Sequence, residues 1–448
     1  MTASDVAHGG WCVARPEGGP VVFVRHALPG ERVLARITEV TSRLVRAQAV
    51  DILAASPDRV EPPCPHAAPG GCGGCDWQHA ALPAQRALKA AVIRQQLRRL
   101  AGIEREVAVE PLPGDGDDGQ SPARMRPAGL GWRTRVQFAV RDDGVAGLHA
   151  HRSHEVIDVG TCLIAHPVIT DLAIPRRRWP AVALVEALAG TASGESAVIV
   201  SPDGTGRTPA RSVSIKGITA DSVLRAGTRN RSVAPLRGRS YLSQRAAGRD
   251  WRVSAGTFWQ VHPGAADALA DAVLAALGPR PGDAVLDLYC GAGLFAGVLA
   301  PGVGPGGTVI GVEADRAAVR DARYNLREWP WAQVRSGDVA GVLAGQGMLP
   351  ARLVVADPPR AGLAREVIDY LGRPGNGAGR LAYVSCDPAT LARDIALLTA
   401  RGWELDGLRA FDAFPMTHHV ECLAALSRAV CRGPRPEREP VSGRTAGR

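Results

Sequence analysis

The chain has 448 residues, 46% of them hydrophobic and 22% charged, which is typical of a globular protein with more than one domain. No apolar run approaches the roughly 20 residues that cross a bilayer, and the first residues lack a basic stretch followed by an apolar one. We therefore expect a cytoplasmic chain with no membrane partner. The formal charge of +9 favours a polyanionic partner, although the dominance of arginine over lysine could also reflect the source genome.

Residues 1–60 are expected to form a small closed antiparallel β-barrel. Segments with β-forming residues at 21–26, 32–40 and 44–53 are separated by Gly and Pro turns. In a basic chain such a barrel could bind RNA, or it could be only a stabilising cap.

Residues 61–250 are expected to form a β-rich central domain that begins with a cysteine-rich segment. Three of the nine cysteines, Cys64, Cys72 and Cys75, fall close together in it. An odd number of cysteines without a secretory leader argues against a disulfide framework. A metal or cluster site with a few free thiols explains the pattern better.

A helix is expected at about 83–100, because proline is favoured in the first turn of a helix. It could pack on the domain at 251–430. We expect its basic face, composed of Arg86, Lys89, Arg94 and Arg98, to be solvated. Residues 111–129 are rich in Gly, Pro and Asp and predict a loop. Strand-like segments between Trp132 and Trp251 complete the central domain.

Residues 251–430 show alternating strands and helices, which predicts an α/β domain with a doubly wound, Rossmann-like parallel sheet. The β-like runs are AVLDLY, TVIGVE, RLVVADP and RLAYVSC. Ligands of such sheets lie beyond the carboxyl ends of the strands. The tail at 431–448 is rich in Pro, Arg and Gly and is expected to be disordered.

Acidic residues close several of these strands. Gly291 and Gly293 permit a tight turn after the first strand, and Glu313, Asp338 and Asp357 close the next three. Glu313 is placed to accept hydrogen bonds from a ribose. The absence of a third glycine at dinucleotide spacing and of a Gly-Lys-Ser/Thr sequence disfavours a phosphate-bearing cofactor. An acidic cleft suits S-adenosylmethionine, which is cationic at sulfur.

Cys386 ends an apolar strand directly before a helix. A helix N-terminus lowers a thiol pKa and favours the reactive thiolate, whereas the adjacent Asp387 opposes this effect. The position suits a nucleophile, but it also suits a buried small side chain.

Several longer motifs resemble the bacterial family of RNA uracil-C5 methyltransferases that carry an iron–sulfur cluster. These motifs are CGGCDWQH, GTFWQVHP, DLYCGAG, DPPRAGL, YVSCDPATLARD and FDAFPMTHHVE. The resemblance covers nearly the whole chain, and the N-terminal barrel looks like a TRAM domain. It implies a class I methyltransferase domain that modifies RNA.

The resemblance also implies roles for individual residues. Cys386 would be the nucleophile that adds to carbon 6 of uracil, and Glu421 the base that removes the proton from carbon 5. His418 and His419 are assigned no role. S-adenosylmethionine would be surrounded by Gln260, Tyr289, Glu313, Asp338 and Asp357.

The cysteines resemble the four-iron cluster site of the same family, with Cys162 as the fourth ligand. Four thiolates are the usual ligands of a 4Fe-4S cluster, although the gap before Cys72 is longer here than in the family. Zinc accepts the same ligands, His66 or His79 could replace a cysteine, and Cys162 could be a plain buried thiol. We expect the cluster to serve structure or RNA binding.

The chain departs from the family at His262, where Asn is common, and at Leu294, where some members have a polar residue. Two alternatives stay open: an RNA methyltransferase acting on a base amine, or a non-catalytic RNA-binding protein. The amine enzymes usually have an aromatic residue at the position of Arg360. We expect ribosomal RNA rather than transfer RNA as the substrate, and a monomer.

Overall fold

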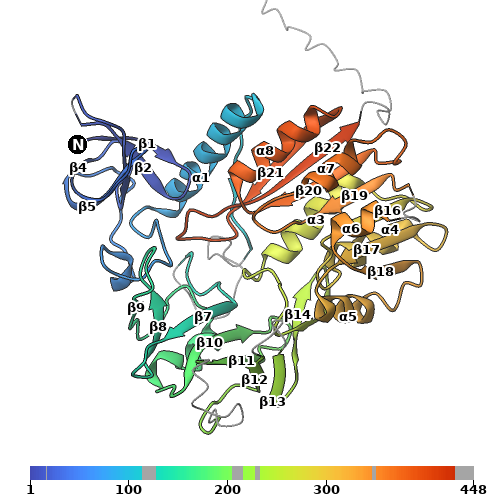
Figure 1. The fold of residues 1–448 in the computed structure, drawn as a ribbon, viewed down its shortest axis with the longest axis horizontal. Helices are drawn as coiled ribbons and strands as arrows, with labels where there is room; N and C mark the ends of the chain where they lie inside the picture. The colour runs from blue at the N-terminus through green and yellow to red at the C-terminus, as the bar shows by residue number, and fades with distance from the viewer. Residues whose placement is uncertain (17, 114–127, 204–214, 228–232, 346–349, 429–448) are drawn as a thin grey trace, which may run out of the picture.

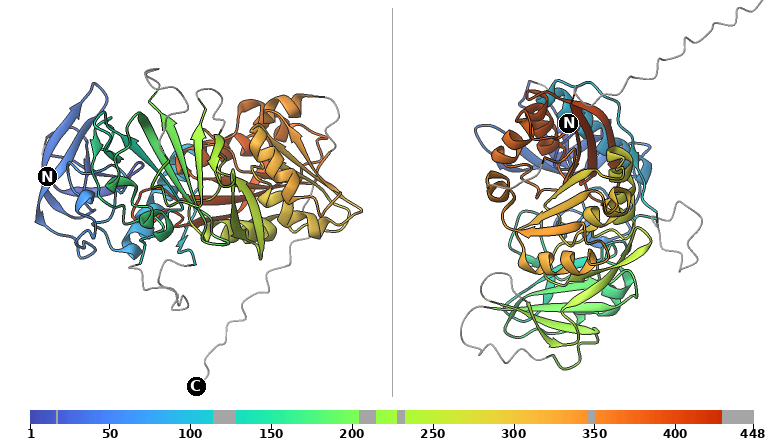
Figure 2. Two further views of the ribbon diagram at one scale, coloured as in Figure 1. Left: turned by 90° about the horizontal axis from the view of Figure 1, so that it is seen from below. Right: turned by 90° about the vertical axis from the view of Figure 1, so that its right-hand side faces the viewer.

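The computed structural model describes residues 1–16, 18–113, 128–203, 215–227, 233–345 and 350–428. It contains a five-stranded, a seven-stranded and an eight-stranded sheet, together with a two-stranded hairpin (Figure 1). The five-stranded sheet and the eight-stranded sheet lie toward opposite ends of the molecule (Figure 2). Within the described residues, no helix is long and apolar enough to cross a membrane. Most of the loop predicted at 111–129 and the tail at 431–448 lie outside these residues.

The N-terminal sheet closes into the predicted barrel, but it is not purely antiparallel. Its strand order is β1-β2-β3-β5-β4, and β3 pairs with β5 in parallel. A bridge between Thr2 and Arg32 joins the two outer strands and closes the barrel. The strands are β1 (Ala3–Ala7), β2 (Trp11–Ala14), β3 (Val22–Arg25), β4 (Arg32–Val40) and β5 (Val45–Ala54).

The central sheet confirms the predicted β-rich region and has the order β13-β12-β11-β10-β7-β8-β9. The short helix α2 (Pro167–Asp171) follows β9 in the chain. The hydrophobic core of the central sheet includes Val136, Val185 and Val198. The strands are β7 (Arg135–Val140), β8 (Ala146–His149), β9 (Val156–Ile157), β10 (Val182–Ala189), β11 (Ser196–Pro202), β12 (Ser222–Ala226) and β13 (Val233–Arg237).

The eight-stranded sheet confirms the predicted doubly wound architecture. Its order is β18-β17-β16-β19-β20-β22-β21-β6, and the neighbours from β18 to β20 are all parallel. The order reverses at β16, so ligands are expected beyond the carboxyl ends of β16 and its neighbours. The strands are β16 (Ala284–Leu288), β17 (Thr308–Glu313), β18 (Ala332–Ser336), β19 (Leu353–Ala356), β20 (Arg380–Ser385), β21 (Trp403–Phe411), β22 (Glu421–Arg428) and β6 (Val109–Glu110).

Helices cover both faces of this sheet. Buried side chains of α1, α7 and α8 form one hydrophobic cluster with the strands, and those of α3 and α4 form another. The hairpin of β14 (Tyr241–Ala246) and β15 (Arg249–Ser254) contributes Trp251 and Val253 to the second cluster. The helices are α1 (Leu82–Gln96), α3 (Ala265–Leu277), α4 (Leu294–Val303), α5 (Arg316–Asn325), α6 (Val339–Ala344), α7 (Arg365–Gly372) and α8 (Pro388–Thr399).

The helix predicted at 83–100 is α1, continued by a π-helical segment at Leu97–Ala101. One expectation about it was wrong. Lys89, predicted on a solvated basic face, is completely buried, with its side chain 0% exposed. Its ammonium group donates hydrogen bonds to Asp412 Oδ1 and to the carbonyl oxygen of Phe414. A cation can be buried here because it is paired with a carboxylate, which periodicity alone does not reveal.

Candidate active site and cysteine cluster

The turn after β16 forms the first part of the site. Tyr289, Gly291 and Gly293 all adopt positive φ, with values of 64°, 54° and 90°. This backbone presents the amide of Gly291 to Glu313, whose Oε2 accepts its hydrogen bond at 3.0 Å. Glu313 is thereby fixed at the carboxyl end of β17, directly beside the glycine turn.

Asp287 lies beneath this turn, inside β16. Its Oδ2 accepts a hydrogen bond from the amide of Ala296 at 2.8 Å, and its buried Oδ1 has no partner among the described residues. Burial raises the pKa of Asp287 to about 8, and the charges of Asp357 and Glu313 add to this effect. Three carboxyl groups therefore converge where the strand order reverses, which suits a cationic ligand.

The remaining residues predicted to bind the cofactor come from separate elements. Asp338 caps α6 by accepting a hydrogen bond from Gly341 N at 3.1 Å, and its charge helps to raise the pKa of Tyr289 behind the larger effect of burial. Gln260 is buried in the segment between β15 and α3. The next residue, Val261, packs in one cluster with Phe414.

The predicted nucleophile and base lie at the ends of adjacent strands. Cys386 follows the last residue of β20, Glu421 begins β22, and Ser385 is paired with Cys422 across the two strands. Burial raises the pKa of the Cys386 thiol to about 11, and the charge of Glu421 adds to this effect. In the free protein, burial and the charge of Glu421 therefore outweigh any lowering of this pKa by the N-terminus of α8.

Glu421 is only 4% exposed, and burial, reinforced by Asp357, raises its pKa well above the usual value. Arg360 opposes both shifts. Its positive charge lowers the pKa of Glu421, and its charge and hydrogen bond lower that of Cys386. The sequence places Arg360 within the DPPRAGL motif but assigns it no role, because its proximity to Cys386 and Glu421 arises only in the fold.

The four predicted cluster ligands are linked by electrostatic effects on their pKa values. The charge of Cys72 contributes to raising the pKa of Cys75 and of Cys162, and that of Cys64 contributes to raising the pKa of Cys72, in each case behind the larger effect of burial. All four thiols are free of disulfides. Among the described residues, no group of three or more His, Cys, Asp or Glu side chains has the arrangement of a metal site. Arg133 lowers the pKa of Cys72 and of Cys162.

Family comparisons agree with this architecture. Residues 2–50 match the TRAM domain, and residues 349–429 match the tRNA (Uracil-5-)-methyltransferase model. Residues 265–344 match the model of protein-L-isoaspartate(D-aspartate) O-methyltransferase. The fold and the acidic strand ends define the class of S-adenosylmethionine-dependent methyltransferases.

Relatives that match nearly the whole chain are RNA methyltransferases. An uncharacterised RNA methyltransferase of Streptomyces avermitilis is 50% identical, covering 95% of this chain and 96% of its own. One from Bifidobacterium longum is 35% identical, covering 94% and 95%. The fold is that of the tRNA (uracil-54, C5)-methyltransferase of Pyrococcus abyssi, solved with S-adenosyl-L-homocysteine, at a TM-score of 0.69, 22% identity and coverage of 95% and 99%. The chain belongs to the bacterial family of TRAM-domain RNA uracil-C5 methyltransferases.

Proposed function

We propose that the chain methylates carbon 5 of one uridine in RNA through a covalent bond between Cys386 and carbon 6 of the base. In this proposal residues 1–60 and 61–250 hold the RNA, and residues 251–430 carry out the transfer. The observation that carries the proposal is the meeting of Cys386 and Glu421 at adjacent strand ends, with Arg360 and Asp357 close enough to shift their pKa values.

The acidic edge supports the assignment of the cofactor site. The unpartnered Oδ1 of Asp287 and the raised pKa of that carboxyl group fit a ligand that brings positive charge. We assign the ribose to Glu313. The other contacts are assigned to Gln260, Tyr289, Asp338 and Asp357. When bound, S-adenosylmethionine supplies an electrophilic methyl group.

The residues of this chain perform the remaining chemistry. The target base must leave its stack to reach a half-buried thiol. Arg360 favours the thiolate of Cys386, which adds to carbon 6 and moves an electron pair onto oxygen 4, so that carbon 5 becomes nucleophilic. After carbon 5 is methylated, Glu421 removes its proton. The electrons of that C–H bond re-form the double bond between carbons 5 and 6 and expel the Cys386 thiolate.

The raised pKa of Glu421 matters for its assigned role as a base. A carboxylate with a raised pKa binds a proton more strongly than an ordinary one. Because the group is 4% exposed, little water competes for that proton.

The test uses 5-fluorouridine-substituted RNA and S-adenosylmethionine labelled with tritium in the methyl group. Fluorine cannot leave carbon 5 as a proton does, so we expect a labelled protein–RNA adduct that survives denaturation and is absent from Cys386→Ala. Glu421→Gln should still form an adduct on ordinary RNA but should release it slowly. Methylation of ordinary RNA without any adduct would instead support transfer to a base amine.

We further propose that the substrate is ribosomal RNA. The support is the resemblance to family members that combine a barrel with a cysteine cluster. The matched family model and the Pyrococcus abyssi protein are both named for transfer RNA, which makes transfer RNA the alternative. Sequencing the trapped RNA decides between them and identifies the uridine.

We also propose that Cys64, Cys72, Cys75 and Cys162 hold a 4Fe-4S cluster. Their mutual electrostatic influence and the nearby Arg133 fit a group bound by four negatively charged thiolates. Such a cluster would tie the segment at 64–75 to the central sheet through Cys162. Anaerobically purified protein should contain about four irons and four sulfides per chain, with much less in Cys162→Ser. Stoichiometric zinc without iron would refute the cluster.

A further inference from the structure

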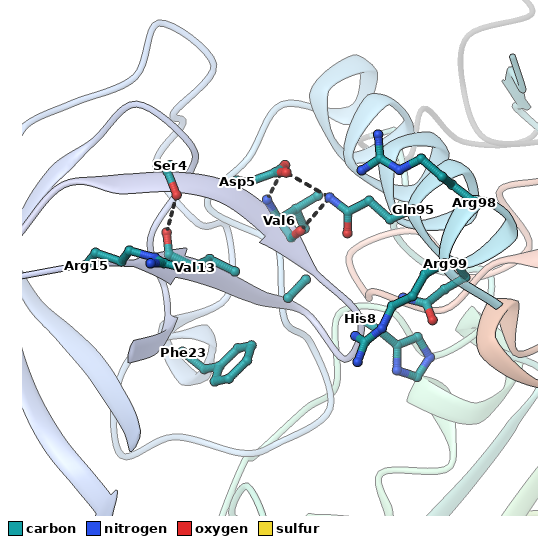
Figure 3. Close-up of a pocket in the computed structure, with 12 residues that line it drawn as sticks. Ser4, Asp5, Val6, His8, Val13, Arg15, Phe23, Gln95, Arg98 and Arg99 are labelled. Atoms are coloured by element: carbon teal, nitrogen blue, oxygen red, sulfur yellow. Dashed lines mark hydrogen bonds between the residues drawn. The ribbon is translucent and has the colours of Figure 1, made fainter. Parts of the chain in front are cut away.

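A groove of about 810 Å³ separates the N-terminal barrel from the end of α1. Figure 3 shows strands of the barrel on one side and the helix on the other, with arginine side chains on both. The residues that carry the argument are His8, Arg15, Phe23, Arg98 and Arg99.

The groove is positively charged. The side chains of Arg15, Arg98 and Arg99 are exposed, and none has an ion-pair or hydrogen-bond partner among the described residues. The nearby carboxylate of Asp5 accepts hydrogen bonds from Gln95 Nε2 at 2.9 Å and from Val6 N at 2.8 Å. Three unpaired guanidinium groups around one depression are suited to bind phosphates, because their planar donors match phosphate oxygens.

The groove leads to the proposed nucleophile. His8, at its rim, pairs with Asp387 through Nε2 and Oδ2 at 3.0 Å. Asp387 follows Cys386 in the chain and caps α8 by accepting a hydrogen bond from Thr390 N at 2.8 Å. The π-helical segment that carries Arg98 and Arg99 also packs against α8, with Leu97 and Leu391 in one hydrophobic cluster.

We propose that this groove binds the backbone of the RNA strand that flanks the target uridine. The inference rests on the proposed function, since it assumes that the flipped base lies at Cys386. The contact of His8 with Asp387 places the groove beside Cys386, so that the phosphates next to the flipped base meet the unpaired arginines. Phe23 adds a half-exposed aromatic side chain, and aromatic side chains stack on bases without regard to sequence.

The test compares two pairs of substitutions at exposed arginines. Arg98→Gln with Arg99→Gln removes charge from the groove. The control pair, Arg280→Gln with Arg373→Gln, removes the same charge away from the groove. These residues lie at the opposite end of the eight-stranded sheet, since Arg280 precedes β16 and Arg373 follows α7. The probe is a fluorescently labelled single-stranded oligouridine, titrated at several salt concentrations.

The groove pair should weaken binding about tenfold at low salt and reduce the slope of log K against log salt by about 1.4, because each lost phosphate contact on a single strand removes about 0.7. The control pair should change neither quantity. The pair Arg98→Lys with Arg99→Lys should keep most of the salt slope, because it retains the charge. Equal losses in both glutamine pairs, or no loss in the groove pair, would overturn the proposal.

The adduct assay separates this proposal from the one on which it rests. At saturating fluorouridine RNA the groove pair should still form the Cys386 adduct, with a higher RNA concentration needed for half-maximal trapping. If the wild type binds oligouridine through these arginines but never forms an adduct, the proposed reaction fails while the groove stands. If adduct forms at the same RNA concentration in wild type and groove pair, the groove assignment fails alone.

Discussion

At the scale of single residues, the proposed reaction depends on Arg360, whose charge opposes the effects of burial and of Glu421 on the pKa of the Cys386 thiol. The pKa of Cys386 is about 11 even with Arg360 in place, so removing this cation should raise it further. Each added unit lowers the thiolate fraction at neutral pH about tenfold. We expect Arg360→Gln to shift the pH dependence of Cys386 alkylation by iodoacetamide to higher pH and to lower kcat at neutral pH.

A matched control is Arg365→Gln, which removes an exposed arginine five positions along the chain. It should leave the alkylation profile of Cys386 in place. If Arg360→Gln behaves like this control, the guanidinium group does not act on the thiol.

Phe258 is a second residue to which the sequence assigns no function. Its side chain is 66% exposed, two positions before Gln260, although large aromatic side chains are usually buried. We expect it to stack on a base of the bound RNA, where such stacking contributes about 1–3 kcal/mol. Phe258→Ala should therefore raise KM for RNA about fivefold or more without changing the affinity for S-adenosylmethionine, and Phe258→Tyr should restore KM. An unchanged KM in Phe258→Ala would exclude the stacking role.

The alternating pattern drew attention to Cys386, Glu313, Asp338 and Asp357 because they follow strands, whereas Gln260, Tyr289 and Glu421 were assigned only through the resemblance to the family. The sequence did not reveal their electrostatics. The sequence left the direction of the Cys386 pKa shift open between the helix N-terminus and Asp387, because it shows neither the burial of the thiol nor the charge of Glu421 from another strand. The sequence shows Asp287 only as part of the run AVLDLY, and its unpartnered oxygen could be recognised only in the folded protein.

At the scale of helices and strands, the alternating pattern predicted β16, β17, β19 and β20 correctly, because buried parallel strands are nearly continuous apolar runs. The barrel was less predictable. Its first two strands, β1 and β2, were not predicted, and the parallel pairing of β3 with β5 depends on contacts distant in sequence.

The buried pair of Lys89 and Asp412 permits a stability prediction at this scale. It joins α1 to the segment after β21, and both side chains are almost fully buried. Removing one partner of such a pair leaves an uncompensated buried charge and typically costs 3–5 kcal/mol. Lys89→Met should lower the free energy of unfolding by about that amount in urea titrations.

The double variant Lys89→Met with Asp412→Leu should recover most of that loss, because it leaves neither charge unpaired. A double variant as unstable as Lys89→Met would show that the loss comes from packing rather than from charge.

At the scale of the whole molecule, Asp76 links the barrel, the cysteine segment and the catalytic domain. It follows Cys75, its Oδ1 accepts a hydrogen bond from Arg25 of β3 at 2.9 Å, and its Oδ2 is 2.6 Å from Nδ1 of His418. His418 lies three residues before Glu421. A displacement of the barrel or of the cysteine segment can thus reach the proposed base through a single carboxylate.

Burial alone would raise the pKa of Asp76, but the hydrogen bond and charge of His418 and the charge of Arg25 hold it well below the usual 3.8. The ionised Asp76 therefore contributes its full stabilisation of the folded state above pH 3.8, the pKa of the unfolded chain. This contribution is lost as the pH falls from there toward the folded-state pKa. Asp76→Asn should accordingly lower the free energy of unfolding at neutral pH. The difference in this free energy between the variant and wild type should shrink as the pH falls below 3.8.

The same variant should uncouple the barrel from the catalytic domain, because the buried guanidinium of Arg25 loses its carboxylate. At neutral pH we expect faster amide hydrogen exchange in β1 to β5 and in the segment before β22, together with a lower kcat. The control Asp51→Asn removes an exposed carboxylate from β5 and should change none of these. Faster exchange in the barrel with an unchanged kcat would mean that Asp76 holds the domains together without positioning Glu421.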